Sequence, residues 1–123
     1  MIEGVVNDRL EAVVPLHVVG PSGAERDIDA VLDTGFSDHL ALPRDVVEGL
    51  GLPLLASADV RLADGGIVFL PTYRVVVLWD GSPREVVAYG VGVGSALIGM
   101  AMIEDHLLVV EAVRGSAISI RAI

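Results

Sequence analysis

Apolar residues alternate with polar ones, or gather in short runs, along most of this chain, and both patterns are typical of β-strands. Ala12–Val19 is rich in valine, Gly20-Pro21-Ser22-Gly23 is a strong turn signal, and Glu25–Leu32 follows it. The last three residues of that second stretch, 30–32, are all apolar and stand directly before Asp33. The pattern predicts a hairpin whose second strand enters the core and ends at Asp33.

Two more hairpins are indicated by Asp-Gly pairs, because glycine accepts the positive φ that tight turns need. One consists of Val60–Ala63 and Ile67–Leu70 around Asp64-Gly65-Gly66, and the other of Arg74–Trp79 and Glu85–Tyr89 around Asp80-Gly81-Ser82-Pro83. Phe69, Tyr73 and Trp79 beside these turns are interpreted as packing residues, with a position in a substrate groove as the alternative for Phe69. Short strands are also expected at His39–Leu42, Ala96–Ile98, Leu107–Val110 and Ala117–Ile120.

Pro43–Leu50 is the clearest helix in the sequence. Pro43 suits a first helical turn, Asp45 lies where the helix dipole favours an anion, and Gly51 is the better of two C-terminal stop signals. Gly99–Asp105 is expected to form a second helical stretch. The prediction is an all-β, closed barrel-like fold in a single domain, residues 1–123, with one or two short helices.

Composition narrows the possible partners. Hydrophobic residues form 53% of the 123 residues, and the mean hydropathy of +0.66 favours an oligomer that hides apolar surface. The formal net charge is −9, and the 8 basic residues are all arginines scattered along the chain. Nucleic acid and anionic membranes are therefore not expected as partners. No cationic leader precedes an apolar stretch at the N-terminus, so a cytoplasmic location is expected.

Three other interpretations carry less weight. The uncharged stretch Val86–Ile103 has the length of a membrane span, but its glycines disfavour a helix, and buried strands joined by a glycine-rich bend at 90–94 explain it as well. That bend also lacks the third glycine position of a nucleotide-binding loop. His17, His39 and His106 lack metal-ligand spacing, and the chain has no cysteine, so neither a metal nor a cofactor is expected.

Asp33-Thr34-Gly35 carries the candidate chemistry. Such a triplet after a strand is most often a turn, but the apolar run before it, and Leu97-Ile98-Gly99 further on, favour a catalytic carboxylate. Two carboxyl groups that share one proton can activate water and protonate a leaving nitrogen. The chain has one such element and is too short for two. It must therefore pair with a copy of itself to complete a dyad.

These residues resemble the retropepsin-like aspartic proteases, the single-domain homodimeric relatives of pepsin. Val31-Leu32-Asp33-Thr34-Gly35-Phe36-Ser37 is similar to the catalytic loop of that family, Ala63-Asp64-Gly65-Gly66-Ile67 to its flap, and Ala96-Leu97-Ile98-Gly99-Met100 to the strand beneath the loop. The matching elements span Val31–Met100. Phe36 after the glycine is similar to bacterial and cellular members, whereas Met100 and Ala101 replace polar residues of the retroviral pattern.

The resemblance implies a homodimeric aspartic endopeptidase that acts on peptide or protein substrates, with Asp33 of each subunit in the dyad. It implies that Thr34 hydrogen-bonds across the dimer axis and that Gly35 binds substrate backbone. Residues implied in substrate binding are Phe36, Ser37, Ala63, Asp64, Gly65, Gly66, Ile67, Leu97 and Ile98. Strands near the first ten residues and near Ala117–Ile123 would interleave to hold the dimer. The alternative is a catalytically silent dimerisation or peptide-binding module with the same fold.

Overall fold

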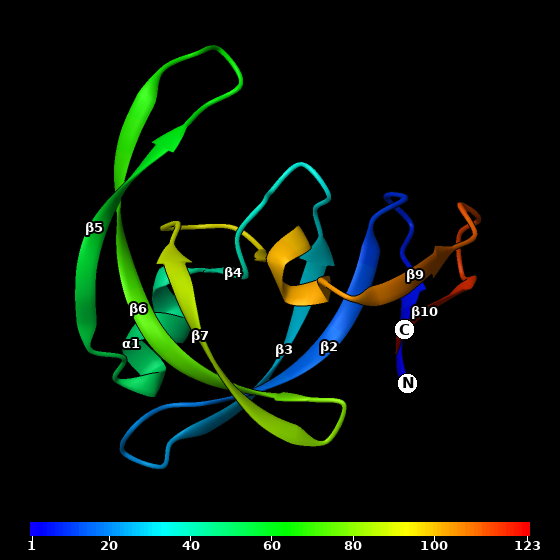
Figure 1. The fold of residues 1–123 in the computed structure, drawn as a ribbon, viewed down its shortest axis with the longest axis horizontal. Helices are drawn as coiled ribbons and strands as arrows, with labels where there is room; N and C mark the ends of the chain where they lie inside the picture. Colours follow the sequence, from blue (N-terminus) through cyan, green and yellow to red (C-terminus); the bar gives the residue numbers. More distant parts are fainter.

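The computed structural model describes residues 1–123 and consists mostly of β-strands (Figure 1). The strands are β1 (Ile2–Val6), β2 (Ala12–Val19), β3 (Glu25–Leu32), β4 (Leu40–Leu42), β5 (Leu54–Arg61), β6 (Ile67–Trp79), β7 (Ser82–Gly90), β8 (Ala96–Ile98), β9 (His106–Val110) and β10 (Ala117–Ala122). One α-helix, α1 (Arg44–Leu50), and one 3₁₀ helix, η1 (Met100–Ile103), interrupt them. None of the helices has the length and apolar character needed to cross a bilayer.

Six strands close into a barrel in the order β6-β7-β4-β8-β3-β2, and pairing between β2 and β6 completes the ring. The all-β, closed-barrel prediction is therefore confirmed. Two extensions leave this barrel: β5 pairs with the first part of β6, and β1, β10 and β9 continue the sheet from β2. Figure 1 shows the first extension as a long hairpin that arches away from the barrel and the second beside both chain termini.

The core lies inside the barrel, where apolar side chains from every barrel strand meet those of α1 and η1. The fully buried members with the largest side chains are Leu40, Leu42, Leu50, Ile98, Met102, Ile120, Val14, Val18, Val75 and Val77. In β2 the buried positions alternate through Val14, Leu16 and Val18, as expected for a strand with one face on the core. Trp79 is buried, which confirms its interpretation as a packing residue.

The β2–β3 hairpin, its Gly20–Gly23 turn and α1 form where the sequence predicts them. Pro43 is the extended N-cap of α1, and Gly51 ends the helix at φ 61° while its N–H bonds the carbonyl of Glu48. The second helical stretch is shorter than expected, since only Met100–Ile103 takes a 3₁₀ conformation.

The two later hairpins share one strand, which corrects the sequence prediction of four separate strands. β6 is continuous over 13 residues. Its first half pairs with β5, its second half with β7, and the partners change near Thr72. Pro71 lies where β6 has β5 on one side only, so its missing N–H interrupts no ladder with β7. Phe69 is 72% exposed, so its interpretation as a packing residue is wrong.

The chain termini pair within the chain. β1 lies between β2 and β10, and β10 lies between β1 and β9. Gly4 permits the approach of β1 to β2, because a Cβ there would stand 2.2 Å from the carbonyl oxygen of Val13. Interleaving of the terminal strands between two subunits would have to break these ladders, which leaves β9 as the strand with an open edge on this side.

Candidate active site

Asp33 follows the last residue of β3 and begins a tight turn. Its carboxylate oxygen Oδ1 accepts a hydrogen bond from the backbone N–H of Gly35 at 3.0 Å, and its carbonyl accepts one from the N–H of Phe36 at 3.1 Å. A Cβ on Gly35 would lie 3.3 Å from that same Oδ1. The turn therefore orients the carboxylate, and the glycine leaves room for its backbone amide to reach it.

The strand β8 and the helix η1, which follow the glycine-rich bend, pack against this turn. β8 lies parallel to β3, with Val31 opposite Leu97 and Leu32 opposite Ile98. The carbonyl of Ile98 then accepts the N–H of Asp33 at 2.9 Å. This confirms that Ala96–Ile98 forms a strand beside the Asp33 segment and leads into a helical turn.

Gly99 is the tightest point of this contact. Its N–H bonds the carbonyl of His39, and the next two amides bond the carbonyls of Phe36 and Asp38. A Cβ at Gly99 would lie 2.0 Å from the carbonyl oxygen of Asp38 and 2.7 Å from the ring of Phe36. No side chain fits there, so residues 33–39 and 98–101 form one interlocked unit.

An apolar cavity of about 300 Å³ opens beside Asp33. The β5–β6 hairpin contributes Val60, Leu62 and Leu70 to its wall, and the barrel side contributes Leu97 and Phe36. The remaining lining residues are Gly35, Ala41, Tyr89 and Val91. Asp33 is the only carboxylate in this lining, so the cavity combines an apolar wall with a single acidic group.

The turn of the β5–β6 hairpin is well defined but lies outside the cavity. Gly65 has φ +86°, the Leu62 N–H bonds the carbonyl of Gly66, and the Gly66 N–H bonds the side chain of Asp64 at 2.8 Å. Residues 63–67 are all exposed. Val60, Leu62 and Leu70, which stand shortly before and after this turn, therefore line the cavity beside Asp33, whereas residues 63–67 do not. Figure 1 shows the turn at the end of the hairpin that is farthest from the barrel.

Aromatic residues and a second carboxylate border the turn on its other side. Phe36 and Tyr89 pack edge to face with ring centroids 5.9 Å apart. Burial, together with the nearby Asp38 carboxylate, raises the pKa of the Tyr89 hydroxyl above its usual value, so the phenol stays neutral at physiological pH. A second hollow of about 270 Å³ lies here and includes Ser37, Asp38 and Arg61 of the hairpin in its lining.

His39 and Arg84 support the loop at its far end. Partial burial, and then the charge of Arg84, lower the pKa of His39, which favours its neutral form. The Arg84 guanidinium donates to the carbonyl of Met102 at 2.8 Å and to that of Ala101 at 3.4 Å. A cation from β7 thus fixes the end of η1 at the place where Met100 and Ala101 supply no polar side chain.

The structure brings together part of the predicted site. Asp33, Gly35, Phe36 and Leu97 share the apolar cavity, and Ser37 lines the neighbouring hollow. Thr34 is exposed beside them. Ile98 is fully buried, and its backbone carbonyl accepts the hydrogen bond from the Asp33 N–H. The five tip residues, Ala63, Asp64, Gly65, Gly66 and Ile67, line neither hollow.

Sequence reasoning missed most of the cavity wall, namely Ala41, Val60, Leu62, Leu70, Tyr89 and Val91. One signal was present: Val60 and Leu62 stand two residues apart on a predicted strand and so share one face. The sequence does not show which way that face points; the three-dimensional position of the hairpin relative to the barrel turns it toward Asp33.

Comparison with solved structures gives a match over nearly the whole fold. The chain superposes on the crystal structure of a retropepsin-like aspartic protease from Rickettsia conorii with a TM-score of 0.65, covering 95% of this chain and 86% of that chain. This chain has a retropepsin-like fold. Sequence identity to that protein is 17%, so the likeness establishes architecture. No protein-family model matches the sequence, and none of the curated proteins matches it.

Proposed function

We propose that this retropepsin-like chain is an aspartic endopeptidase that acts as a homodimer. The observation that carries the proposal is the position of Asp33: it ends a core strand, is oriented by the Gly35 amide, and is the only carboxylate in an apolar cavity under a long hairpin. A single chain supplies one such carboxylate. The second would come from the same turn of another copy.

In this mechanism the two Asp33 carboxyls share one proton, because two adjacent carboxylates cannot both ionise cheaply. The ionised member takes a proton from water as the water oxygen attacks the substrate carbonyl, and the protonated member gives its proton to the carbonyl oxygen. A proton then moves to the amide nitrogen, and the C–N bond breaks. No metal, nucleophilic side chain or cofactor takes part.

The remaining residues bind and position the substrate. An extended peptide would lie between the Asp33–Ser37 floor and the hairpins, held by backbone hydrogen bonds. Gly35 is exposed and would contribute its carbonyl to them, because its N–H already bonds the Asp33 carboxylate. The cavity would take one apolar side chain, with Leu97 and Phe36 on its floor side and Val60 and Leu62 on its hairpin side. Thr34 would bond across the dimer axis, and the 63–67 tip would close over the peptide.

The test is cleavage of a denatured protein mixture at mildly acid pH, with and without a statine-type transition-state mimic. The proposal expects fragments whose formation the mimic suppresses, and an Asp33→Asn variant that forms none while keeping the far-UV circular dichroism and oligomeric state of the parent. Full activity of Asp33→Asn would end the proposal.

The silent-module alternative makes a different forecast in the same experiment. It uses the cavity, whose lining is almost entirely apolar, to bind extended peptides, and Asp33 is then dispensable. Peptide capture that is equal in the parent and in Asp33→Asn, without any fragments, would favour this module over the enzyme.

A further inference from the structure

The long hairpin of β5 and β6 is joined to the barrel at one narrow point. In β6, only Thr72 and Tyr73 pair with β5 on one side and with β7 on the other. Residues 67–71 of β6 have β5 as their only neighbouring strand. Figure 1 shows this part of the hairpin arching away from the barrel. Thr72 and Tyr73 therefore form the base of a two-stranded arm, and a tilt of the arm relative to the barrel begins there.

β5 is irregular at the same point. Leu54 pairs with Tyr73 and Ala56 pairs with Thr72, so Leu55 is an extra residue without a partner in β6. An extra residue of this kind interrupts the ladder and lets its strand bend. The base of the hairpin thus combines one continuous strand with one bulged strand.

Thr72 is the one polar residue that the fold buries, and its side chain spans this bulge. It is 4% exposed, and its Oγ1 donates a hydrogen bond to the carbonyl of Ala56 at 3.0 Å. Burying a hydroxyl without a partner is unfavourable, so the fold favours keeping these two residues together. The bond therefore ties the bulged strand to the continuous strand at the place where hairpin and barrel meet.

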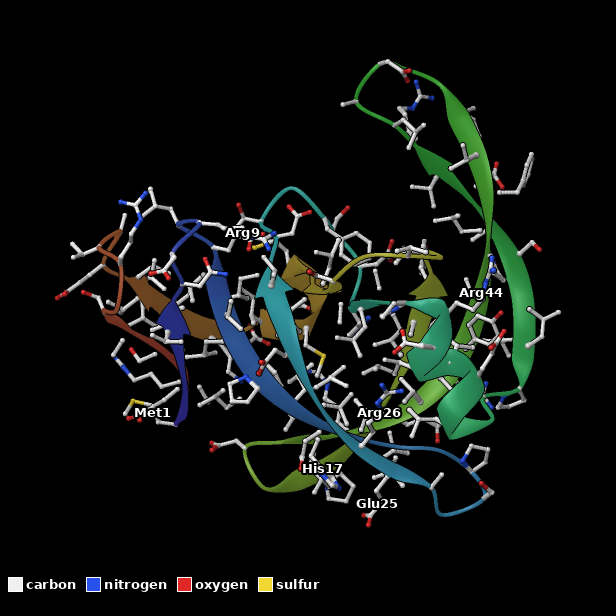
Figure 2. All side chains as sticks on the ribbon, turned by 180° about the vertical axis from the view of Figure 1, so that it is seen from behind. Met1, Arg9, His17, Glu25, Arg26 and Arg44 are labelled. Carbon is white, nitrogen blue, oxygen red and sulfur yellow. The ribbon has the colours of Figure 1, made fainter.

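The surroundings of the base are tightly packed toward β7 and open toward α1. Gly90 at the end of β7 leaves no room for a side chain, because a Cβ there would lie 2.9 Å from the Tyr73 ring and 3.1 Å from Pro71. Beside this contact, a hollow of about 450 Å³ extends to α1. Arg44 of α1 lines the hollow and lies next to the hairpin strands in Figure 2. β6 is thus fixed to β7 at its base but has free space toward α1.

The hairpin carries part of the candidate active site, so its tilt sets the shape of that site. Val60, Leu62 and Leu70 line the cavity beside Asp33, and all three lie on the hairpin beyond Thr72. Leu70 also lines the hollow beside α1, so movement of the base changes both spaces together. A hairpin held at one angle presents its apolar wall in place, whereas a loose hairpin has to be ordered when a substrate binds.

We propose that Thr72 is a positioning residue, whose hydrogen bond to Ala56 fixes the angle of the β5–β6 hairpin over the Asp33 cavity. This inference rests on the proposed function, because it names what prepares the substrate-binding wall for that reaction. Thr72 does not line the cavity, so it acts on the substrate only through the hairpin. Loss of its hydroxyl should weaken substrate binding and leave the chemistry at Asp33 unchanged.

A distance measurement tests the hinge without any need for activity. The chain has no cysteine, so spin labels can be attached to Ala63→Cys at the hairpin tip and Ser82→Cys on the barrel, both exposed positions. Labelled chains are diluted into unlabelled ones, so that only distances within one subunit count. Thr72→Val, which keeps the β-branched shape without the hydroxyl, should at least about double the width of the distance distribution. Thr72→Ala should act alike, and Thr72→Ser should keep the parent's width.

Steady-state cleavage supplies a second readout. The substrate is a synthetic peptide that spans one bond cut by the parent in the denatured protein mixture. Thr72→Val should raise KM about fivefold, the effect of one net hydrogen bond, and change kcat less than about twofold. Thr72→Ser should retain the parent's constants. Ser57→Ala is the matched control, because it removes an exposed hydroxyl from the residue next to Ala56, and it should change neither constant.

The outcomes separate the hinge from the chemistry. Equal distance distributions in the parent, Thr72→Val and Thr72→Ala would overturn the hinge and leave the proposed enzyme standing. Broader distributions in both variants, in a protein that shows no mimic-sensitive cleavage, would support the hinge and remove the enzyme. A fall in kcat at unchanged KM, or a Thr72→Ser protein that behaves like Thr72→Val, would overturn the role proposed for Thr72.

Discussion

Replacing Gly99 with alanine should disrupt the contact between the Asp33 loop and the β8–η1 segment. The new Cβ would stand 2.0 Å from the carbonyl oxygen of Asp38 and 2.8 Å from that of Phe36, and both are backbone atoms that cannot rotate away. The Asp33 loop and the β8–η1 segment would have to move apart. This movement would lengthen or break the three backbone hydrogen bonds that the amides of residues 99–101 donate to the carbonyls of His39, Phe36 and Asp38.

The magnitude follows from these contacts. Three hydrogen bonds at about 1 kcal/mol each give about 3 kcal/mol, and overpacking of a filled site typically adds about 1–3 kcal/mol. A loss of about 3 kcal/mol or more in the free energy of unfolding is expected, which corresponds to a fall in Tm of more than about 10 °C for a protein of this size.

Urea denaturation followed by far-UV circular dichroism measures the loss, at one fixed protein concentration because assembly contributes to apparent stability. Gly49→Ala is the matched control. Gly49 lies within α1, and a Cβ there would meet only the Arg26 guanidinium at 3.2 Å. This exposed group also bonds Asp45, and it can shift by a few tenths of an ångström because it is the end of a long side chain. That variant should be unchanged or more stable by up to about 1 kcal/mol. A Gly99→Ala protein within about 0.5 kcal/mol of the parent would refute the interlocked-loop account.

Further predictions concern the histidines and the cavity. Hydrogen bonds to Asp27 and Glu25 raise the pKa of His17 (Figure 2), so its stabilising contribution is complete below the unfolded pKa of 6.5 and is lost as pH rises through the folded pKa. His17→Gln should therefore lower Tm at about pH 5.5 and have little effect at about pH 8.5. Burial lowers the pKa of His39 in the folded protein, so at a pH below the unfolded pKa of 6.5 the unfolded state binds the proton more readily and the free energy of unfolding falls. On acidification, His39→Gln should therefore lose less stability than the parent. Equal losses would contradict this reasoning. For peptides with a bulky apolar residue at the cleaved bond, Leu62→Ala should reduce kcat/KM about tenfold, whereas Phe69→Ala on the same hairpin should not change it, because Phe69 does not line the cavity.

Sequence alone predicts the features that depend on local rules. The β2–β3 hairpin follows from valine-rich strands around a Gly-Pro-Ser-Gly turn, α1 from Pro43 and Gly51, and the strand that ends at Asp33 from the apolar run before it. Each of these signals lies within about ten residues of the element that it specifies, so no knowledge of distant partners is needed.

The features that sequence did not predict depend on which distant segments pair. In the sequence, Pro71 divides the 13-residue β6 into two apparent strands. In the structure the strand continues through Pro71, because its pairing partner changes there from β5 to β7. The resemblance implies a strand near the first ten residues but places it between two subunits, whereas β1 pairs with β2 and β10 of its own chain, where Gly4 permits close contact with Val13. The cavity wall likewise becomes visible only when the hairpin face with Val60 and Leu62 is placed over Asp33.

The central claim is that each active site needs Asp33 from two copies, and co-refolding of parent and Asp33→Asn chains tests it most directly. At a fixed total concentration, mimic-sensitive cleavage should fall with the square of the parent fraction, to about one quarter at an equal mixture, because only parent–parent dimers hold two carboxylates. A linear fall, to about one half at the equal mixture, would show that one Asp33 suffices and would contradict the account.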